Sequence, residues 1–271
     1  MNRNITTRCV FVLFLALATS FAFPRITGTT AAAQDAGAKP DTAKPWTPPE
    51  VSTIPEGPVG DSIRLGLRIF NDTPKYAAPY VGNKMSCRHC HIGSGTVPGG
   101  IPIVGVPGLF PMYREREKVV VTFEERIEEC FQRSENGHRV PNNSPEMTAL
   151  VAYSQWLSKG QVVGRPFPGR GLVKLPELNG DLERGSQIYN EQCALCHGAE
   201  GAGTPPAVPS VWGPDAYNQG AGMNNINRMA AFVQHNMPMT SPGSLTPQQA
   251  YDVATYIHSK PHTQFDITQH Q

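Results

Sequence analysis

Two short segments of the same pattern constrain this chain more than any other feature of its sequence. Each places two cysteines three positions apart and a histidine directly after the second; they are Cys87-Arg88-His89-Cys90-His91 and Cys193-Ala194-Leu195-Cys196-His197. Two thiols at this spacing fit one helical turn and can form thioethers to the two vinyl groups of a haem, while the histidine binds its iron. Redox-active cysteine pairs and half zinc sites share the cysteine spacing, but neither accounts for both histidines.

The two motifs therefore predict two covalently bound haem c groups. The predicted iron ligands directly after the cysteine pairs are His91 and His197. The predicted thioether positions are Cys87, Cys90, Cys193 and Cys196.

The sequence repeats itself around the two motifs. Six residues before the first motif recur before the second with one position of slippage: Asp61, Arg64, Gly66, Ile69, Phe70 and Asn71 match Asp181, Arg184, Gly185, Ile188, Tyr189 and Asn190. A helix-start signal follows each motif, at Ser144-Pro145 and at Thr246-Pro247. We predict an all-α fold of two class I cytochrome c-like domains, each with long Gly/Pro-rich loops around a covalent haem c.

The predicted helices of the first repeat cover residues 62–71, 122–136 and 144–159. Thr122 and Glu125 have the spacing of a capping box at the start of the second of these helices. Gly137 suits the position just after its end.

The domain boundaries follow from these signals and from proline density. We assign 1–33 to a signal peptide, 34–60 to a Pro-rich tether, 61–165 to an N-terminal cytochrome c domain, 166–180 to a linker and 181–271 to a C-terminal cytochrome c domain. Residues 260–271 are expected to form a loose tail.

The first 33 residues have the pattern of an export signal. Arg3 and Arg8 precede an apolar run over 9–23, and small residues at 31–33 offer a cleavage site. The run is short for a membrane span, although an uncleaved anchor is the alternative. Covalent haem attachment also needs an exported chain, so we predict a periplasmic protein.

Charge excludes one class of partner. The 271-residue chain has a formal charge of +1, and removal of the predicted signal leaves 20 basic against 22 acidic residues. No basic excess exists to bind nucleic acid. With 39% hydrophobic and 17% charged residues, the chain is neither charge-rich and disordered nor a multi-pass membrane protein.

The second haem needs a ligand opposite its histidine. Met237-Pro238 lies shortly before the last predicted helix and resembles the Met-Pro ligand loop of class I cytochromes c. We favour Met237, with Met239 and Met223 as the alternatives. Each of these methionines could instead fill a loop or the core.

For the first haem the candidates are Cys130, His138 and Met112. Cys130 is the odd cysteine left once the signal and the two motifs are set aside. It shares a helical face, which we expect to point inward, with Phe123, Ile127, Phe131 and Ser134. Arg126 and Arg133 flank it on the helix, and guanidinium groups near a thiol favour the thiolate and bind oxyanions. The alternatives are a buried inert cysteine and arginines that pair with neighbouring glutamates.

Three segments resemble the dihaem thiosulfate dehydrogenase family. They are residues 126–137 (RIEECFQRSENG), residues 110–116 (FPMYRER) and the second-domain residues Trp212-Gly213-Pro214, Gly220-Ala221-Gly222-Met223 and Asn236-Met237-Pro238. The resemblance covers roughly residues 60–260.

This resemblance implies a periplasmic enzyme that couples two thiosulfates into tetrathionate and passes two electrons to a soluble or membrane-bound cytochrome c. It implies that Cys130 is the thiolate ligand opposite His91 at the active-site haem. It places Arg116, Arg126 and Ser134 at the same site, and His197 with Met237 at an electron-transfer haem. Some members carry a lysine beside that methionine, where this chain has Asn236, so a lysine ligand exchange is not expected.

Three other functions remain open at the level of sequence. A dihaem electron carrier would use no substrate and would leave Cys130 unexplained. A tetrathionate reductase would run the same chemistry in reverse. A haem-thiolate subunit of a multi-component sulfur-oxidising complex would need a partner subunit and a carrier protein.

Overall fold

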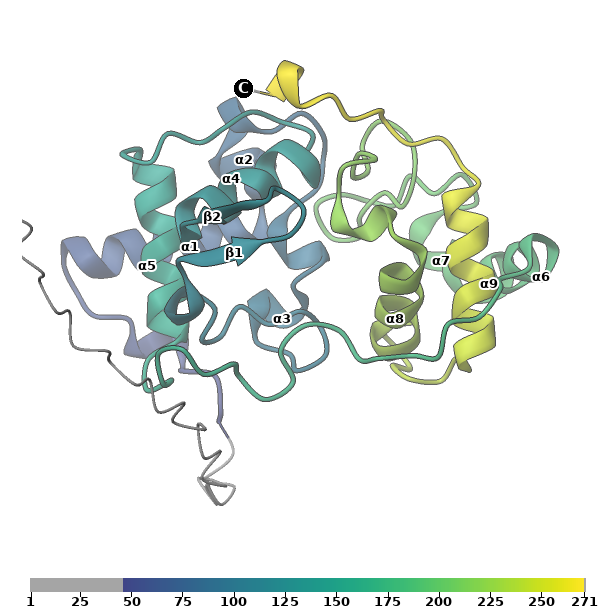
Figure 1. Cartoon of the computed structure of the whole chain (residues 1–271), viewed down its shortest axis with the longest axis horizontal. Coiled ribbons are helices and arrows are strands. Elements are labelled where there is room, and N and C mark those ends of the chain that lie inside the picture. The colour runs from purple at the N-terminus through teal and green to yellow at the C-terminus, as the bar shows by residue number, and fades with distance from the viewer. Residues whose placement is uncertain (1–45, 271) are drawn as a thin grey trace, which may run out of the picture. The chain divides into compact units, whose positions relative to one another are not determined.

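The computed structural model of the chain describes residues 46–270 (Figure 1). The predicted signal peptide, 1–33, and the first part of the predicted tether lie outside the described residues. Within 46–270 no helix combines the length and the apolar composition that a membrane span requires. The domain boundaries given above stay a prediction.

The described chain is mostly helical, as the sequence predicts. The helices of the first half are α1 (Pro58–Asn71), α2 (Thr73–Tyr76), α3 (Ile92–Gly95), α4 (Phe123–Arg133) and α5 (Pro145–Leu157). Those of the second half are α6 (Leu182–Ile188), α7 (Ala194–His197), α8 (Ile226–Asn236) and α9 (Pro247–His258). Short 3₁₀ turns and one π-helical turn, Tyr189–Cys193, join them.

Each half is built on the same crossing of a first and a last helix, α1 with α5 and α6 with α9. A glycine stands at each contact point. A Cβ on Gly66 would lie 2.1 Å from the Ala149 carbonyl oxygen, and one on Gly185 would lie 2.0 Å from that of Asp252. The repeat seen in the sequence is thus a repeat of close helix packing.

Alanine at Gly185 is expected to destabilise the protein by about 1–3 kcal/mol, because α6 and α9 must separate to admit the methyl group. Thermal unfolding of the haem-loaded protein measures the loss. Gly108→Ala is the matched control, since the nearest atom to its Cβ is 3.4 Å away. Equal melting temperatures for the two variants would contradict the close crossing.

Three features differ from the sequence prediction. Met112–Arg114 (β1) and Val119–Val121 (β2) form a small antiparallel hairpin, which the sequence analysis missed. Helix α8 was also missed. Helix α4 begins at its Thr122/Glu125 capping box as predicted but ends at Arg133.

The residue that turns the chain away after α4 is Asn136 and not the predicted Gly137. Asn136 adopts the left-handed conformation (φ 49°). Gly137 is needed for a different reason, because a Cβ there would lie 1.8 Å from the carbonyl oxygen of Tyr80. The predicted C-terminal glycine is therefore a close-approach glycine.

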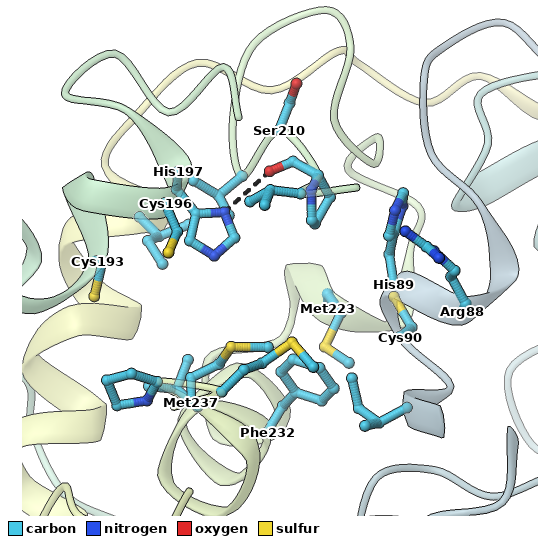
Figure 2. Close-up of a pocket in the computed structure, with 18 of the residues that line it drawn as sticks. Arg88, His89, Cys90, Cys193, Cys196, His197, Ser210, Met223, Phe232 and Met237 are labelled. Carbon is cyan, nitrogen blue, oxygen red and sulfur yellow. Dashed lines mark hydrogen bonds between the residues drawn. The ribbon is translucent and has the colours of Figure 1, made fainter. Parts of the chain in front are cut away.

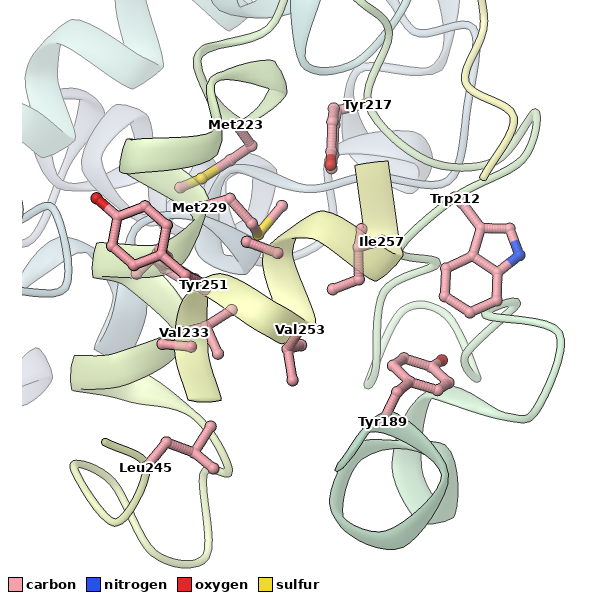
Figure 3. Packing of buried hydrophobic residues seen from close by; sticks show 14 of the residues in the cluster. Tyr189, Trp212, Tyr217, Met223, Met229, Val233, Leu245, Tyr251, Val253 and Ile257 are labelled. Atoms are coloured by element: carbon pink, nitrogen blue, oxygen red, sulfur yellow. The ribbon is translucent and has the colours of Figure 1, made fainter. Parts of the chain in front are cut away.

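Two separate hydrophobic cores lie under the two halves. The first gathers α1 and α5 around Ile69, Phe131 and Tyr153. The second, drawn in Figure 3, gathers α8 and α9 around Met229, Val233 and Val253. The rings of Tyr189 and Trp212, tilted by 46°, lie 4.9 Å apart in the same core.

The expectation of a loose tail after residue 260 is wrong for the described residues. The segment leaves α9 and runs back to the first half (Figure 1), where Gln132 Nε2 donates to the His270 carbonyl at 2.7 Å. His270 Nδ1 donates to the Gly137 carbonyl at 2.7 Å, and Arg133 stacks on the Phe265 ring at 4.6 Å. These contacts hold the tail on the C-terminal end of α4.

Candidate functional site

The first cysteine motif forms a 3₁₀ turn, Cys87–His89, capped by Ser86. His91 Nδ1 donates to the Ile101 carbonyl at 2.6 Å, which leaves Nε2 as the nitrogen for a metal. Burial lowers the pKa of His91 to about 4; the hydrogen bond to Ile101 opposes this shift and the nearby Arg126 adds to it. A neutral imidazole with a fixed ring is what an iron ligand requires.

The second motif repeats this arrangement on α7. His197 Nδ1 donates to the Pro209 carbonyl at 3.0 Å, and burial lowers the pKa of the ring. The imidazole faces a cavity of about 470 Å³, within the size range of cofactor sites. Figure 2 shows Met237 across this cavity from His197.

The three candidate methionines differ in position. Met239 is 66% exposed, whereas Met223 is buried and Met237 is half-buried. All three line the cavity, together with Cys193 and Cys196. The position of Met237 opposite the imidazole agrees with the sequence preference for it.

These residues fit a covalent haem. The cavity is lined mainly by apolar side chains, with three cysteines and two imidazoles whose pKa values are lowered by burial. Tyr217 also lines it, and its buried hydroxyl makes no hydrogen bond within residues 46–270. A donor of this kind suits the carboxylate edge of a bound macrocycle. Cys90 of the first motif borders the same cavity, so the two motifs lie next to each other.

The sequence analysis gave no role to the residues between the first cysteine pair. His89 Nε2 donates to the Pro206 carbonyl at 2.9 Å, and Arg88 donates to the same oxygen at 2.7 Å. Both ring nitrogens of His89 are used, since Nδ1 accepts from the Ser86 amide. The first motif thus holds a loop of the second domain, which could not be inferred from either repeat alone.

Cys130 lies on α4 within reach of the guanidinium predicted to flank it. Arg126 Nη1 donates to the Cys130 sulfur at 3.1 Å and also pairs with Glu129 at 3.2 Å. The electrostatic interaction with Cys130 is the largest cause of the raised pKa of Arg126. Burial, with a smaller contribution from Cys130, raises the pKa of Cys90 to about 12, so Cys130 lies close to the first motif.

The predicted inward face of α4 is only partly right. Phe131 is buried, but Phe123, Ile127, Cys130 and Ser134 are half-buried. Glu128 and Glu129 are buried instead, because Arg139 pairs with Glu128 and Arg126 pairs with Glu129. The core thus lies beside the cysteine face and not directly beneath it.

Arg116 and Ser134 occupy different surroundings. Arg116 Nη1 donates to the Gly220 carbonyl of the second domain at 3.2 Å. Arg133, which the sequence placed beside Cys130, reaches the same oxygen at 3.5 Å. Ser134 lies one turn after Cys130, and its amide donates to the Cys130 carbonyl.

Glu135 is a buried carboxyl next to the first motif. The Cys87 thiol donates to its Oε1 at 3.6 Å, and its Oε2 has no hydrogen-bond partner within residues 46–270. Burial raises the pKa of Glu135 to about 8. A thioether at Cys87 cannot donate this hydrogen bond, which lowers the pKa of Glu135. With a haem attached, burial therefore raises that pKa with less opposition.

Stability is therefore expected to fall as pH rises between the ordinary carboxyl pKa and about 8. Over this range the folded protein holds a proton on Glu135 that the unfolded chain has lost, and above it both states are ionised. Glu135→Gln should remove this fall. As pH rises across the range, the free energy of unfolding of the variant should therefore increase relative to that of the wild type by a few kcal/mol. Denaturant unfolding of the haem-loaded proteins at about pH 5 and about pH 9 measures it. If the difference in unfolding free energy between the variant and the wild type is the same at both pH values, Glu135 is not protonated in the folded protein.

Comparison with known proteins assigns the same two halves. The family described as "Cytochrome c" matches residues 182–261, and the family described as "SoxA/TsdA, cytochrome c domain" matches residues 74–163. Curated thiosulfate dehydrogenases resemble the chain over most of its length. The enzyme from Stutzerimonas stutzeri is 41% identical, over 79% of this chain and 72% of its own length. The enzyme from Allochromatium vinosum is 39% identical, over 81% of this chain and 85% of its own length.

A solved structure agrees with the fold. The thiosulfate dehydrogenase (TsdBA) from Marichromatium purpuratum is 40% identical, with a TM-score of 0.75 over 79% of this chain. The match covers 49% of that longer chain, about half of its length. These findings confirm the predicted two cytochrome c domains with their covalent haem c chemistry. The chain belongs to the thiosulfate dehydrogenase family, and it is an oxidoreductase that acts on sulfur.

Proposed function

We propose that this chain oxidises two thiosulfate ions to tetrathionate in the periplasm and passes two electrons to a cytochrome c. The observation that carries the proposal is the 3.1 Å contact between Arg126 and the sulfur of Cys130, beside the first cysteine motif. A purely electron-carrying cytochrome has no use for a cysteine sulfur in contact with a guanidinium at this place.

Two haem c groups would serve this reaction. Cys87 and Cys90 would hold the first, with His91 and Cys130 as iron ligands. Cys193 and Cys196 would hold the second, with His197 and Met237. When bound, each haem supplies a one-electron acceptor, and a thiolate ligand gives the first a lower potential than a thioether gives the second.

The sulfur chemistry balances without a proton. The Cys130 thiolate and the sulfane sulfur of one thiosulfate form an S–S bond, and two electrons are released to the two haems. The sulfane sulfur of a second thiosulfate then attacks the sulfane sulfur bound to Cys130, which forms tetrathionate and frees the Cys130 thiolate. Two dianions must meet, so Arg116 and Arg126 would offset their repulsion and orient them, with Ser134 beside them.

The surroundings of the second motif support electron exit from the second domain. Cys90 borders the cavity of the second motif, which gives a short route between the two haems. Leu195, between the second pair of cysteines, is 95% exposed. An exposed apolar side chain beside the residues that would hold the second haem suits brief contact with another cytochrome.

The test is an assay of the purified, haem-loaded chain with thiosulfate and ferricyanide. We expect tetrathionate in a ratio of one to two ferricyanide ions reduced. An electron carrier, or a subunit that needs a partner, would give no tetrathionate under these conditions. Reduction of tetrathionate by the same protein at a higher rate would favour the reverse direction.

A further inference from the structure

Five arginines gather around two glutamates beside Cys130. Glu117 pairs with three of them and Glu129 with two, over distances of 3.2–4.0 Å. The arginines are Arg114, Arg116, Arg126, Arg133 and, from the second domain, Arg228. The cluster thus has a local excess of positive charge that its own carboxylates do not cancel.

Arg228 stands apart because it belongs to α8. Its guanidinium lies against the Gly220–Gly222 loop, 3.7 Å from where a Cβ on Gly222 would stand. Two residues earlier in this loop, the Gly220 carbonyl accepts from Arg116 and Arg133. The loop therefore brings cations of both domains to one place.

The surroundings of Arg228 show that this cation lacks a counter-charge. Its pKa is lowered first by burial and then by Arg116, Arg126 and Arg114. Within residues 46–270 its amide bonds to Asn225, but no carboxylate pairs with its guanidinium. Four cations that repel one another, Arg114 and Arg126 half-buried and Arg116 and Arg228 exposed, provide a site for a multivalent anion that can be reached from solvent.

The proposed reaction needs two such positions. Each thiosulfate carries a sulfonate, and tetrathionate carries one at each end of a chain of sulfur atoms. Arg126, in contact with Cys130, suits the anion whose sulfane sulfur bonds to that cysteine. The second anion must lie farther out, where Arg116 meets the second domain.

We propose that Arg228, with Arg116 and the Gly220–Gly222 loop, forms a second sulfonate subsite that holds the second thiosulfate and one end of tetrathionate. This inference rests on the function proposed above. It makes the second domain part of the substrate site, in addition to its role in electron transfer. Gly220 lets this loop pack against the C-terminal segment, since a Cβ there would meet Phe265 at 2.5 Å.

The test compares Arg228→Ala and Arg228→Lys with a variant outside the cluster, Arg165→Ala, which replaces an exposed arginine at the end of the predicted N-terminal domain. In Arg228→Ala the half-saturating thiosulfate concentration should rise about tenfold or more, with kcat within about twofold of wild type. The initial rate should also become second order in thiosulfate at low concentration, because the second anion then binds weakly. Lysine should restore part of the affinity. Loss of kcat at an unchanged half-saturating concentration, or equal behaviour of the alanine variants at 228 and 165, would overturn the proposal.

A second measurement separates this inference from the proposed reaction. Calorimetric titration of the fully oxidised, haem-loaded protein with tetrathionate reports anion binding without turnover. We expect a Kd about tenfold higher in Arg228→Ala than in Arg165→Ala. That result would stand even if the wild type formed no tetrathionate, whereas equal Kd values would sink the subsite itself.

Discussion

Replacing Cys130 with glycine should lower tetrathionate formation by at least about 10³-fold, because the residue supplies the sulfur that forms the intermediate. Both haem groups should stay attached, since the thioether cysteines are untouched. The measurement is the ferricyanide-coupled rate, together with covalent haem content and the absorption spectrum of the oxidised protein. The spectrum should change at one haem only.

Two outcomes would contradict this assignment. Turnover within about tenfold of wild type would show that Cys130 is a buried cysteine without a chemical role. Loss of haem from the first motif would show a structural role, and Cys130→Ser would then test activity in a protein of nearly unchanged shape.

Removal of the guanidinium beside Cys130 is the prediction with the second largest effect. Arg126→Ala should lower kcat for thiosulfate by about 10²–10³-fold, because a positioned cation at the reacting sulfur contributes most where charge is transferred. Arg126→Lys should recover only part of the rate, since lysine cannot make the same planar, paired contact. Steady-state kinetics on haem-loaded protein separates this effect on kcat from an effect on KM.

Glu129→Gln is the matched control for Arg126. It removes the 3.2 Å ion pair but keeps the 3.1 Å contact with sulfur, so it should retain most of the rate. If the two variants lose activity equally, the ion pair and not the contact with Cys130 is what matters.

The sequence predicted the parts of this protein that depend on local pattern. The two haem motifs, the helices opened by Ser144-Pro145 and Thr246-Pro247, and the capping box at Thr122 all follow from residues a few positions apart. The matching glycines Gly66 and Gly185 were visible as a repeat. Their reason, a helix crossing that leaves no space for a Cβ, appears only when the partner helix is in place.

The remaining parts depend on contacts between distant residues. The pairing of Arg126 with Cys130 could be predicted from their spacing of one helical turn. The position of Arg228 could not, because 98 residues separate it from Cys130 and its charge pattern on α8 is ordinary. Burial of Glu128 was missed for a similar reason, since its partner Arg139 lies beyond the end of the helix.

The segment after α9 has a consequence for the order in which the protein assembles. Phe265 and His270 stack on each other and hold Arg133, Gln132 and Gly137 at the end of α4. These two residues are synthesised after both haem motifs. The helix that carries Cys130 can therefore reach its final contacts only after the second domain has been made. We infer that the two domains mature together, because the end of α4 gains these contacts only from residues that follow the second domain.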